Sequence, residues 1–219
     1  MNETVFTLIA PVYDRMNRLL SAGMDGLWRG RLVGGMSGSP RRIVDLAAGT
    51  GEVSRRIARR FPQAEVLALD LDEAMLAEAR GKRIGGNVTF RRMDARAFAS
   101  AVDRPVDAVT CAFGFRNFPD AEGVLRECRK VLPAGGELAL LEFFRIESRV
   151  LGWCVRAWTL GLSFVLSAKR RASYRYLCES MRQTYEVSEF VALAGRRGFR
   201  LVRRSRYFPC CTHLVFVAR

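Results

Sequence analysis

The sequence predicts an α/β fold: an open sheet of seven mostly parallel strands with helices on both faces. Short apolar strands alternate with amphipathic helices between residues 41 and 144, at the spacing of βαβ units. The strand segments are nearly continuous runs of Val, Ile, Leu and Ala, which is typical of strands buried on both faces. The length of 219 residues suits a single domain with an appended region.

The predicted core alternates strands with helices in chain order. Strands are expected at 41–47, 64–70, 87–94, 105–113 and 135–143, and helices at 52–61, 72–82 and 120–132. In the first helix, Val53, Ile57 and Phe61 fall on one face. That helix can therefore cover the sheet.

The remaining residues extend the same domain at both ends. We assign residues 1–40 to a helical arm and linker, 41–144 to the cofactor-binding βαβ core, 145–185 to a helical lid and substrate region, and 186–219 to a closing helix (188–198) and two strands (199–208 and 211–219). The linker after the arm is rich in Gly, Ser and Pro, which favour turns.

Charge is distributed unevenly along the chain. The 36 Lys and Arg outnumber the 22 Asp and Glu, a formal net charge of +14. Residues 145–219 contain 15 of the basic residues and four of the acidic ones. This asymmetry indicates an anionic partner, for which nucleic acid and an anionic membrane surface both qualify, or else a solvated basic face.

The cysteines lack the spacing of a zinc site or a disulfide framework, and the chain has one His. We therefore expect no metal and a reducing, cytoplasmic location. The N-terminus lacks a basic segment before an apolar one, so we expect no secretory signal.

Residues 150–168 form an apolar stretch followed by cations at 169–171, and three interpretations are open. The stretch is a membrane-spanning helix, a lid packed on the sheet, or a lid that also contacts the membrane interface through Trp153 and Trp158. Arg156 and the need for about 20 apolar residues count against a spanning helix.

The first motif is VDLAAGTGE at residues 44–52, where a strand passes into a helix. Gly49 and Gly51 allow a tight turn and a close approach of the backbone to a ligand. The dinucleotide fingerprint needs a third glycine at the position of Ser54, so a pyrophosphate is not the expected ligand.

Carboxylates follow three strands of the predicted core. Asp45, Asp70 and Asp94 would line one carboxyl edge, where open α/β sheets bind ligands. Asp70 can hold the two hydroxyls of a ribose, and Asp94 with Ala95 suits an adenine edge. This arrangement predicts a nucleoside ligand, the alternative being that these Asp residues are helix N-caps.

These strand ends resemble those of class I methyltransferases that use S-adenosylmethionine, and longer blocks narrow the resemblance. APVYDRMNRLLSAGMDGLWR, DLAAGTGE, AFGFRNFPD, LRECRKVLPAGGELALLEFF and YRYLCESM occur in that order, at 10–29, 45–52, 112–120, 125–144 and 174–181. In this order they are similar to the ubiquinone/menaquinone biosynthesis C-methyltransferase family. The resemblance implies a Rossmann-like fold and methylation of a ring carbon of a demethylated polyprenyl hydroquinone.

The resemblance implies S-adenosylmethionine as cofactor, S-adenosylhomocysteine as its product, and no metal. The residues expected at the cofactor are Asp45, Ala47, Gly49, Thr50, Gly51, Asp70, Leu71, Met75, Asp94, Ala95 and Ala112.

Arg116 and Asn117 of the FGFRN segment follow the fourth strand and are expected over the reacting methyl group. A hydroquinone carbon becomes nucleophilic when the neighbouring hydroxyl, with a pKa of about 10, loses its proton. Arg116 remains protonated, so we expect it to stabilise the phenolate while Asn117 orients an acceptor water. The alternative for Arg116 is an ion pair.

The arm is expected to fold over the cofactor edge and exclude water. Tyr13 is a candidate hydrogen-bond partner of the substrate hydroxyl. Candidate substrate contacts are Asn17, Trp28, Phe115 and Tyr176, although such residues also suit plain core packing.

Departures from the family pattern leave the acceptor open. Asp25 replaces a usual His, Ala97 lies where an LPF element is usual, and Phe144 replaces a Ser. His213 is expected to be a satisfied strand residue. The alternatives are a small phenolic or polyketide-like acceptor, a non-catalytic scaffold in quinone biosynthesis, and a nucleic-acid methyltransferase, which AFGFRN does not favour.

The expected partner is thus a lipophilic quinol, reached by peripheral association with the inner face of an anionic membrane. We expect no nucleic-acid partner. A homodimer or a quinone-biosynthesis complex stays open.

Overall fold

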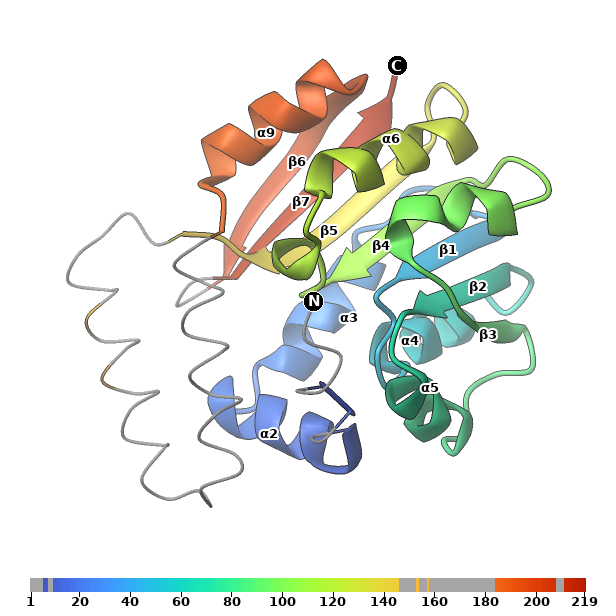
Figure 1. The fold of residues 1–219 in the computed structure, drawn as a ribbon, viewed down its shortest axis with the longest axis vertical. Coiled ribbons are helices and arrows are strands. Elements are labelled where there is room, and N and C mark those ends of the chain that lie inside the picture. Colours follow the sequence, from blue (N-terminus) through green and yellow to red (C-terminus); the bar gives the residue numbers. More distant parts are fainter. Residues whose placement is uncertain (1–5, 8–9, 146–152, 154–156, 158–183, 208–210) are drawn as a thin grey trace.

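The computed structural model describes residues 6–7, 10–145, 153, 157, 184–207 and 211–219. Its seven strands form one sheet in the order β3-β2-β1-β4-β5-β7-β6 (Figure 1). The strands are β1 Arg42–Leu46, β2 Glu65–Asp70, β3 Val88–Arg92, β4 Ala108–Ala112, β5 Glu137–Phe143, β6 Phe199–Tyr207 and β7 Cys211–Ala218. The predicted fold class is confirmed.

Strands β1 to β5 are parallel, and β7 is antiparallel to both β5 and β6. The strand order changes direction between β1 and β4, which leaves a crevice at their carboxyl ends. This is the edge of an open α/β sheet at which ligands bind.

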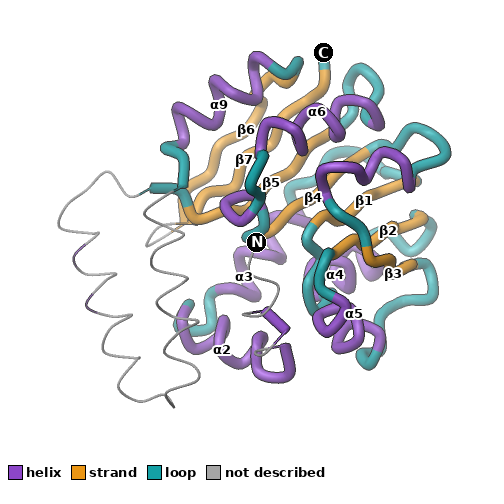
Figure 2. Tube along the Cα trace, viewed as in Figure 1, coloured by secondary structure: helices purple, strands orange, loops and turns teal. Residues whose placement is uncertain are grey.

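Helices cover both faces of the sheet (Figure 2). They are α2 Tyr13–Leu20, α3 Asp25–Gly34, α4 Glu52–Arg60, α5 Glu73–Arg80, α6 Ala121–Val131 and α9 Val187–Arg196, with short 3-10 helices η1 Ala10–Val12, η2 Ala95–Ala101 and η3 Phe115–Asn117. Helices α6 and α9 pack with η2 in one apolar cluster, and α3 and α4 pack in another.

The alternation of side chains along β1 explains why the core has two layers. Val44 and Leu46 belong to the cluster under α6 and α9, whereas Ile43 belongs to the cluster under α3 and α4. Successive side chains of a strand point to opposite faces, so one apolar strand supplies both layers.

The helix starts follow from local capping. The Asp72 carboxylate accepts hydrogen bonds from the backbone N–H groups of Ala74 and Met75, and thereby starts α5. Glu186 and Glu189 form a reciprocal capping box at the start of α9. These residues set where each helix leaves the sheet edge.

The structure differs from the predicted elements at the end of the third strand. The strand expected at 87–94 ends at Arg92, and the 3-10 helix η2 follows at Ala95 because Asp94 accepts a hydrogen bond from the backbone N–H of Arg96.

Most of the predicted lid at 145–185, including residues 158–183 with Trp158, lies outside the described residues. Trp153 is described and is 71% exposed. Among the described helices, none is long and apolar enough to cross a membrane.

Candidate active site

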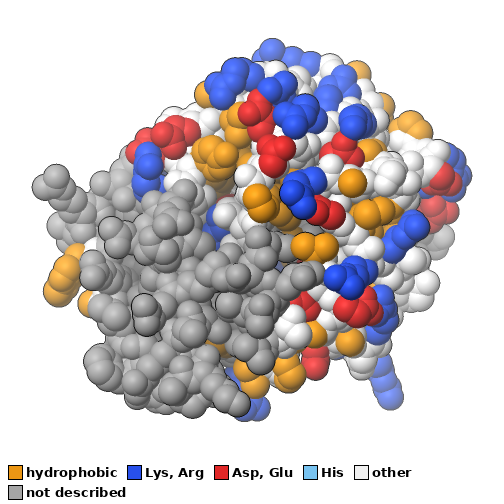
Figure 3. Space-filling view, in the orientation of Figure 1, with side chains coloured by type: hydrophobic (Ala, Val, Ile, Leu, Met, Phe, Trp, Pro, Cys, Tyr) orange, Lys and Arg blue, Asp and Glu red, His pale blue; other side chains and the backbone are white. Residues whose placement is uncertain are grey.

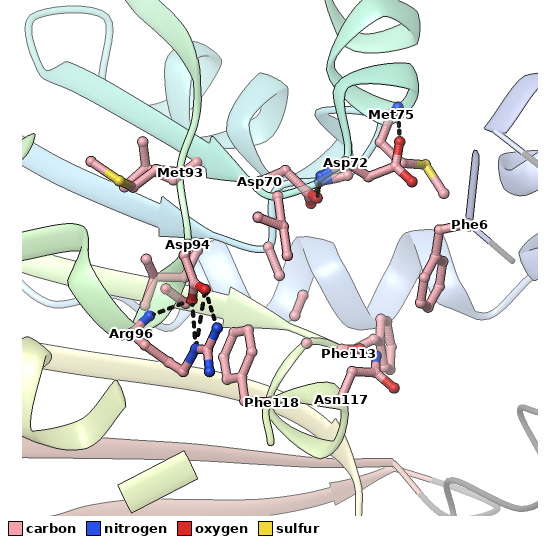
Figure 4. Close-up of a pocket in the computed structure, with 18 of the residues that line it drawn as sticks. Phe6, Asp70, Asp72, Met75, Met93, Asp94, Arg96, Phe113, Asn117 and Phe118 are labelled. Carbon is pink, nitrogen blue, oxygen red and sulfur yellow. Dashed lines mark hydrogen bonds and ion pairs between the residues drawn. The ribbon is translucent and has the colours of Figure 1, made fainter. Parts of the chain in front are cut away.

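A cavity of about 380 Å³ lies at the carboxyl ends of β1, β2 and β4 (Figure 4). Its walls come from the strand ends, the start of α5, the turn after β4 and the N-terminal arm. The lining residues are Phe6, Tyr13, Leu46, Ala47, Gly49, Leu69, Asp70, Leu71, Asp72, Met75, Met93, Asp94, Ala95, Arg96, Ala112, Phe113, Gly114, Asn117, Phe118 and Pro119.

The turn between β1 and α4 places backbone against the cavity. Gly49 has φ +56 and Gly51 has φ +77, in the left-handed region that glycine tolerates. A Cβ on Gly51 would lie 2.6 Å from the Ile84 side chain, so this glycine also lets the turn pack on its neighbours. The motif glycines therefore have the conformational role expected of them.

Asp70 is the central carboxylate of the cavity. One carboxylate oxygen accepts a hydrogen bond from the Gly49 N–H (2.7 Å), and the other accepts from the Asp72 N–H (2.9 Å). Burial raises the pKa of Asp70 above its usual value, and the two backbone donors oppose that shift. Each oxygen keeps a second lone pair, so the carboxylate can still accept two hydroxyl donors.

Asp94 lies across the cavity from Met75 and pairs with Arg96, as the dashed lines of Figure 4 show. Its Oδ2 accepts from Arg96 Nε (3.0 Å) and Nη2 (2.6 Å), and this contact lowers the pKa of Asp94. Both residues line the cavity. Asp94 is therefore ionised, but part of its acceptor capacity is already used.

The N-terminal arm closes one side of the cavity through polar contacts at two points. The Thr7 hydroxyl donates to the Asp72 carboxylate (2.7 Å), and the Thr50 hydroxyl donates to Asp14 of α2 (2.6 Å). Lys82 Nζ donates to Asp14 (2.5 Å) and to the Thr50 carbonyl (2.7 Å). The arm is thus tied to the glycine turn.

The turn after β4 forms the opposite wall and has an unusual backbone. Phe113 has φ +61, which is strained for a bulky residue. A Cβ on Gly114 would lie 2.6 Å from Ala47 and 2.7 Å from the Cys111 sulfur, so only glycine lets this turn approach the β1 turn. The Asn117 side chain donates to the Phe113 carbonyl (3.2 Å).

Arg116, which was expected over the reacting methyl group, forms an ion pair in this structure, the alternative stated for it. Arg116 is not among the lining residues, because its guanidinium forms an ion pair with Glu142 at the end of β5. Its Nη1 also donates to the Phe113 carbonyl (2.8 Å). The pair is buried, with the Arg116 side chain 6% and the Glu142 side chain 2% exposed. Asn117 does line the cavity, as expected.

Most of the expected cofactor residues line the cavity, and three do not. The lining ones are Ala47, Gly49, Asp70, Leu71, Met75, Asp94, Ala95 and Ala112. Asp45 instead lies behind the turn, where it accepts from Ser54 Oγ (2.6 Å) and Thr110 Oγ1 (2.7 Å). Burial raises its pKa to about 6. Thr50 and Gly51 are also buried in packing around the turn.

Of the four residues expected to contact the substrate, the three that the structure describes do not line the cavity. Trp28 is 3% exposed and packs edge-on against Phe143, with ring centroids 6.0 Å apart. Phe115 is 4% exposed and packs against Phe118 and Phe190. Both belong to the core, as large aromatic side chains usually do. Asn17 lies in α2 outside the cavity lining, and Tyr176 lies outside the described residues.

Tyr13 lines the cavity as expected. Several other lining residues were not predicted: Phe6, Leu46, Leu69, Asp72, Met93, Arg96, Phe113, Gly114, Phe118 and Pro119. A usable signal existed for Asp72, which precedes a helix as an N-cap two residues after Asp70.

The two remaining unusual residues, Asp25 and His213, are both buried and lie outside the cavity lining. Asp25 pairs with Arg29, and burial lowers the pKa of His213 to about 4. His213 Nδ1 lies 3.4 Å from the Tyr207 hydroxyl, but its Nε2 has no hydrogen-bond partner, so this histidine is only partly satisfied. Within the described residues, no group of three His, Cys, Asp or Glu side chains could hold a metal ion.

Comparison with known proteins shows similarity to one family of methyltransferases. Residues 2–215 match the model of the ubiE/COQ5 methyltransferase family. The chain is 35% identical to the demethylmenaquinone methyltransferase of Thermotoga maritima (93% of this chain, 90% of the relative) and 40% identical to that of Thermus thermophilus (89% and 91%). It is 33% identical to a ubiquinone/menaquinone biosynthesis C-methyltransferase of Cereibacter sphaeroides (93% and 84%).

Solved structures share the fold at low sequence identity. A putative methyltransferase of Haloferax volcanii, in complex with the activator Trm112, superposes with a TM-score of 0.70 at 15% identity (97% of each chain). The magnesium protoporphyrin IX methyltransferase of Synechocystis, which has S-adenosylhomocysteine bound, gives 0.62 at 19% identity (94% of each chain).

Proposed function

The chain belongs to the ubiE/COQ5 methyltransferase family, and from that premise we propose that it methylates a ring carbon of a demethylated polyprenyl hydroquinone. The observation that carries this proposal is the composition of the two cavity walls. One wall presents Asp70 and the glycine turn, and the other presents Asn117 and the Phe113 turn. A nucleoside cofactor and an aromatic acceptor can therefore meet between them.

The first wall fits S-adenosylmethionine. The Asp70 carboxylate keeps acceptor capacity for two ribose hydroxyls, while Leu71 and Met75 supply apolar surface beside it. Asp70 and Asp72 supply negative charge at the cavity, which suits the positive sulfonium and ammonium groups, whereas the charge of Asp94 is balanced by Arg96. When bound, the cofactor supplies an electrophilic methyl group.

The second wall fits a phenolic acceptor. We assign Asn117 and Tyr13 to contact the acceptor hydroxyl, because both line the cavity on the side of the Phe113 turn and the arm. Loss of the hydroxyl proton raises electron density at the neighbouring ring carbon, and a water oriented by Asn117 takes that proton. Once the ring carbon has accepted the methyl group, it would lose its own hydrogen as a proton to solvent, which restores the aromatic hydroquinone. Phe113 and Phe118 supply aromatic surface for the ring. The arm excludes water from the methyl group.

A panel of acceptors tests this proposal. Purified enzyme receives radiolabelled S-adenosylmethionine with demethylmenaquinol, a demethylated ubiquinol precursor, or small phenols without a polyprenyl tail. We expect transfer to the polyprenyl hydroquinones, and loss of transfer in an Asp70→Ala control. Faster transfer to the small phenols would contradict the proposal and favour the small-acceptor alternative.

We further propose that the enzyme binds reversibly to an anionic membrane, because a polyprenyl acceptor is confined to lipid. Exposed cations over α6 and α9 alternate with acidic groups (Figure 3). By contrast, Arg200, Arg204 and Arg206 are exposed along the edge strand β6, and none pairs with a described carboxylate. The expected cations at 169–171 lie outside the described residues.

Cosedimentation with vesicles tests the membrane proposal. Binding is expected on phosphatidylglycerol vesicles and not on phosphatidylcholine, and should weaken with salt, because each Arg near the surface contributes about 1 kcal/mol. Arg204→Ala with Arg206→Ala should weaken binding more than Arg59→Ala with Arg60→Ala, which removes equal charge from the end of α4. Equal binding to both vesicle types contradicts the proposal, and salt-sensitive binding to duplex DNA would support a nucleic-acid partner.

A further inference from the structure

Glu142 is a buried carboxylate, and the hydrogen bonds described for its side chain come from Arg116 of the turn after β4 and from its own neighbour Phe143. One carboxylate oxygen accepts hydrogen bonds from Arg116 Nη1 and from the Phe143 backbone N–H (2.8 Å). The other accepts from the Arg116 backbone N–H (3.2 Å). Glu142 thus holds both the side chain and the backbone of Arg116.

Arg116 in turn holds the strained residue of the turn. Its Nη1 and the Asn117 amide both donate to the Phe113 carbonyl. A left-handed conformation at a bulky residue is unfavourable and persists where surrounding contacts fix it. The Phe113 carbonyl is therefore the point at which the ion pair acts on the cavity wall, which Phe113 and Asn117 both form.

Aromatic stacking and cation–π contacts also hold the turn after β4 in place. The Phe113 and Phe143 rings are stacked, with centroids 4.8 Å apart. The Arg116 guanidinium lies 5.6 Å from the Phe143 centroid, and that of Arg29 lies 5.2 Å from the Phe113 centroid. Cations are attracted to aromatic faces, most strongly where water is excluded. Orienting Arg116 therefore also orients the rings.

We propose that Glu142 is a positioning residue for methyl transfer: it orients Arg116, which fixes the Phe113 carbonyl and the Asn117 amide at the acceptor side of the cavity. This inference rests on the proposed function, because it assigns Asn117 to the acceptor. Glu142 itself does not line the cavity, and neither does Arg116. Their effect on turnover is therefore transmitted through the turn.

The matched pair of variants is Glu142→Gln and Glu137→Gln. Glu137 is a second buried glutamate of β5 but lies at the opposite end of the strand, where it accepts from the Ser37 N–H (3.1 Å). We expect Glu142→Gln to lower kcat about 10- to 100-fold, since small displacements of a positioned group can have effects of this size. The affinity for S-adenosylhomocysteine should stay within about twofold of wild type. Glu137→Gln should change neither quantity.

A double variant separates positioning from simple stabilisation. Glu142→Gln removes the buried carboxylate that pairs with Arg116, which should lower the melting temperature. Adding Arg116→Gln removes the Arg116 charge and should raise the melting temperature again, while kcat stays as low as in the single variant. Recovery of kcat together with the melting temperature would overturn the proposal, as would a kcat of Glu142→Gln within about twofold of wild type.

Amide hydrogen exchange distinguishes failure of this proposal from failure of the proposed function. If wild-type enzyme methylates no hydroquinone, the proposed function fails, and exchange alone tests the positioning. Protection of residues 113–118 should fall in Glu142→Gln but not in Glu137→Gln. Unchanged protection in Glu142→Gln overturns the proposal whether or not the enzyme turns over.

Discussion

The two walls of the cavity use polar groups in opposite ways. On the cofactor side, Asp70 accepts one backbone donor at each oxygen and keeps capacity for a ligand. On the acceptor side, the charged side chains of Arg116 and Glu142 are buried and form an ion pair. One wall therefore presents its charge to a ligand, and the other uses charge to fix its own shape.

In the proposed function, this difference lets one edge of the sheet serve two ligands. A nucleoside offers hydroxyls that need acceptors, so an incompletely satisfied carboxylate gives affinity. A lipophilic ring offers few polar groups, so the wall that faces it needs apolar side chains that fit the ring and a few well-placed polar groups, such as the Asn117 amide. The ion pair supports that surface and does not supply the contact.

The largest effect is expected for Arg116→Ala, which breaks the acceptor wall. Removal of one partner of a buried pair leaves Glu142 as an uncompensated charge, which should reduce the free energy of unfolding by about 3–5 kcal/mol. We also expect kcat to fall about 100-fold or more, as when a preorganised group is lost. Urea denaturation and initial rates measure these changes. The exposed Arg126→Ala is the control, and turnover within about threefold of wild type would contradict the account.

Asp45→Asn tests how the buried carboxylate of Asp45, behind the glycine turn, changes the stability of the protein with pH. Burial raises the pKa of Asp45 from 3.8 to about 6, so the folded protein binds more protons than the unfolded chain between these values. Stability from this group therefore falls as pH rises from about 4 to about 6, by roughly 2–3 kcal/mol.

The Asn variant should lack that fall. Its free energy of unfolding relative to wild type should rise across the window, as measured by denaturation at each pH. His213, with its lowered pKa, gives the opposite slope in both proteins and cancels in the difference. A difference independent of pH would contradict the assignment for Asp45.

Asp70→Ala tests the open acceptor capacity of the cofactor wall. Loss of charged hydrogen bonds should weaken S-adenosylhomocysteine binding by about 1.5–3 kcal/mol, or roughly 10- to 150-fold in Kd. Calorimetric titration gives this value directly. An unchanged Kd would remove Asp70 from the cofactor site.

Lys82→Met gives the smallest expected effect, because it removes the partly exposed contacts of Lys82 with Asp14 of the arm, the Thr50 carbonyl and Glu52. The pair of Lys82 with Asp14 is partly exposed, so its contribution should be below about 1 kcal/mol and fall with salt. We expect cofactor dissociation to accelerate about two- to fivefold, measured by stopped-flow fluorescence. Arg80→Met, which removes an exposed pair with Glu73, should leave this rate unchanged, and equal effects of both variants would contradict the role of the arm.

Eight of the residues expected at the cofactor line the cavity, and they could be identified from the sequence because their signals are local. A glycine turn after one strand and Asp70 at the end of the next are brought to one edge by parallel pairing alone. Asp45 was misplaced because side chains alternate along β1, and its position points it away from the cavity toward Ser54 and Thr110.

The acceptor wall could not be predicted in the same way, because its contacts join distant segments. Arg116 of η3 pairs with Glu142 of β5, and the LEFF segment carries no periodic signal for such a contact. Trp28 and Phe115 were candidate substrate contacts because they are aromatic, but packing decides whether an aromatic ring lines a cavity or fills the core.

The central claim, carbon methylation between these two walls, is tested most directly by locating the transferred methyl group. Enzyme, demethylmenaquinol and S-adenosylmethionine with a ¹³C-labelled methyl group are incubated under reducing conditions, and the product is examined by NMR. We expect the label on a ring carbon, with one S-adenosylhomocysteine formed for each methyl transferred. A label bonded to oxygen, or no labelled quinol while S-adenosylhomocysteine binds normally, would contradict the claim.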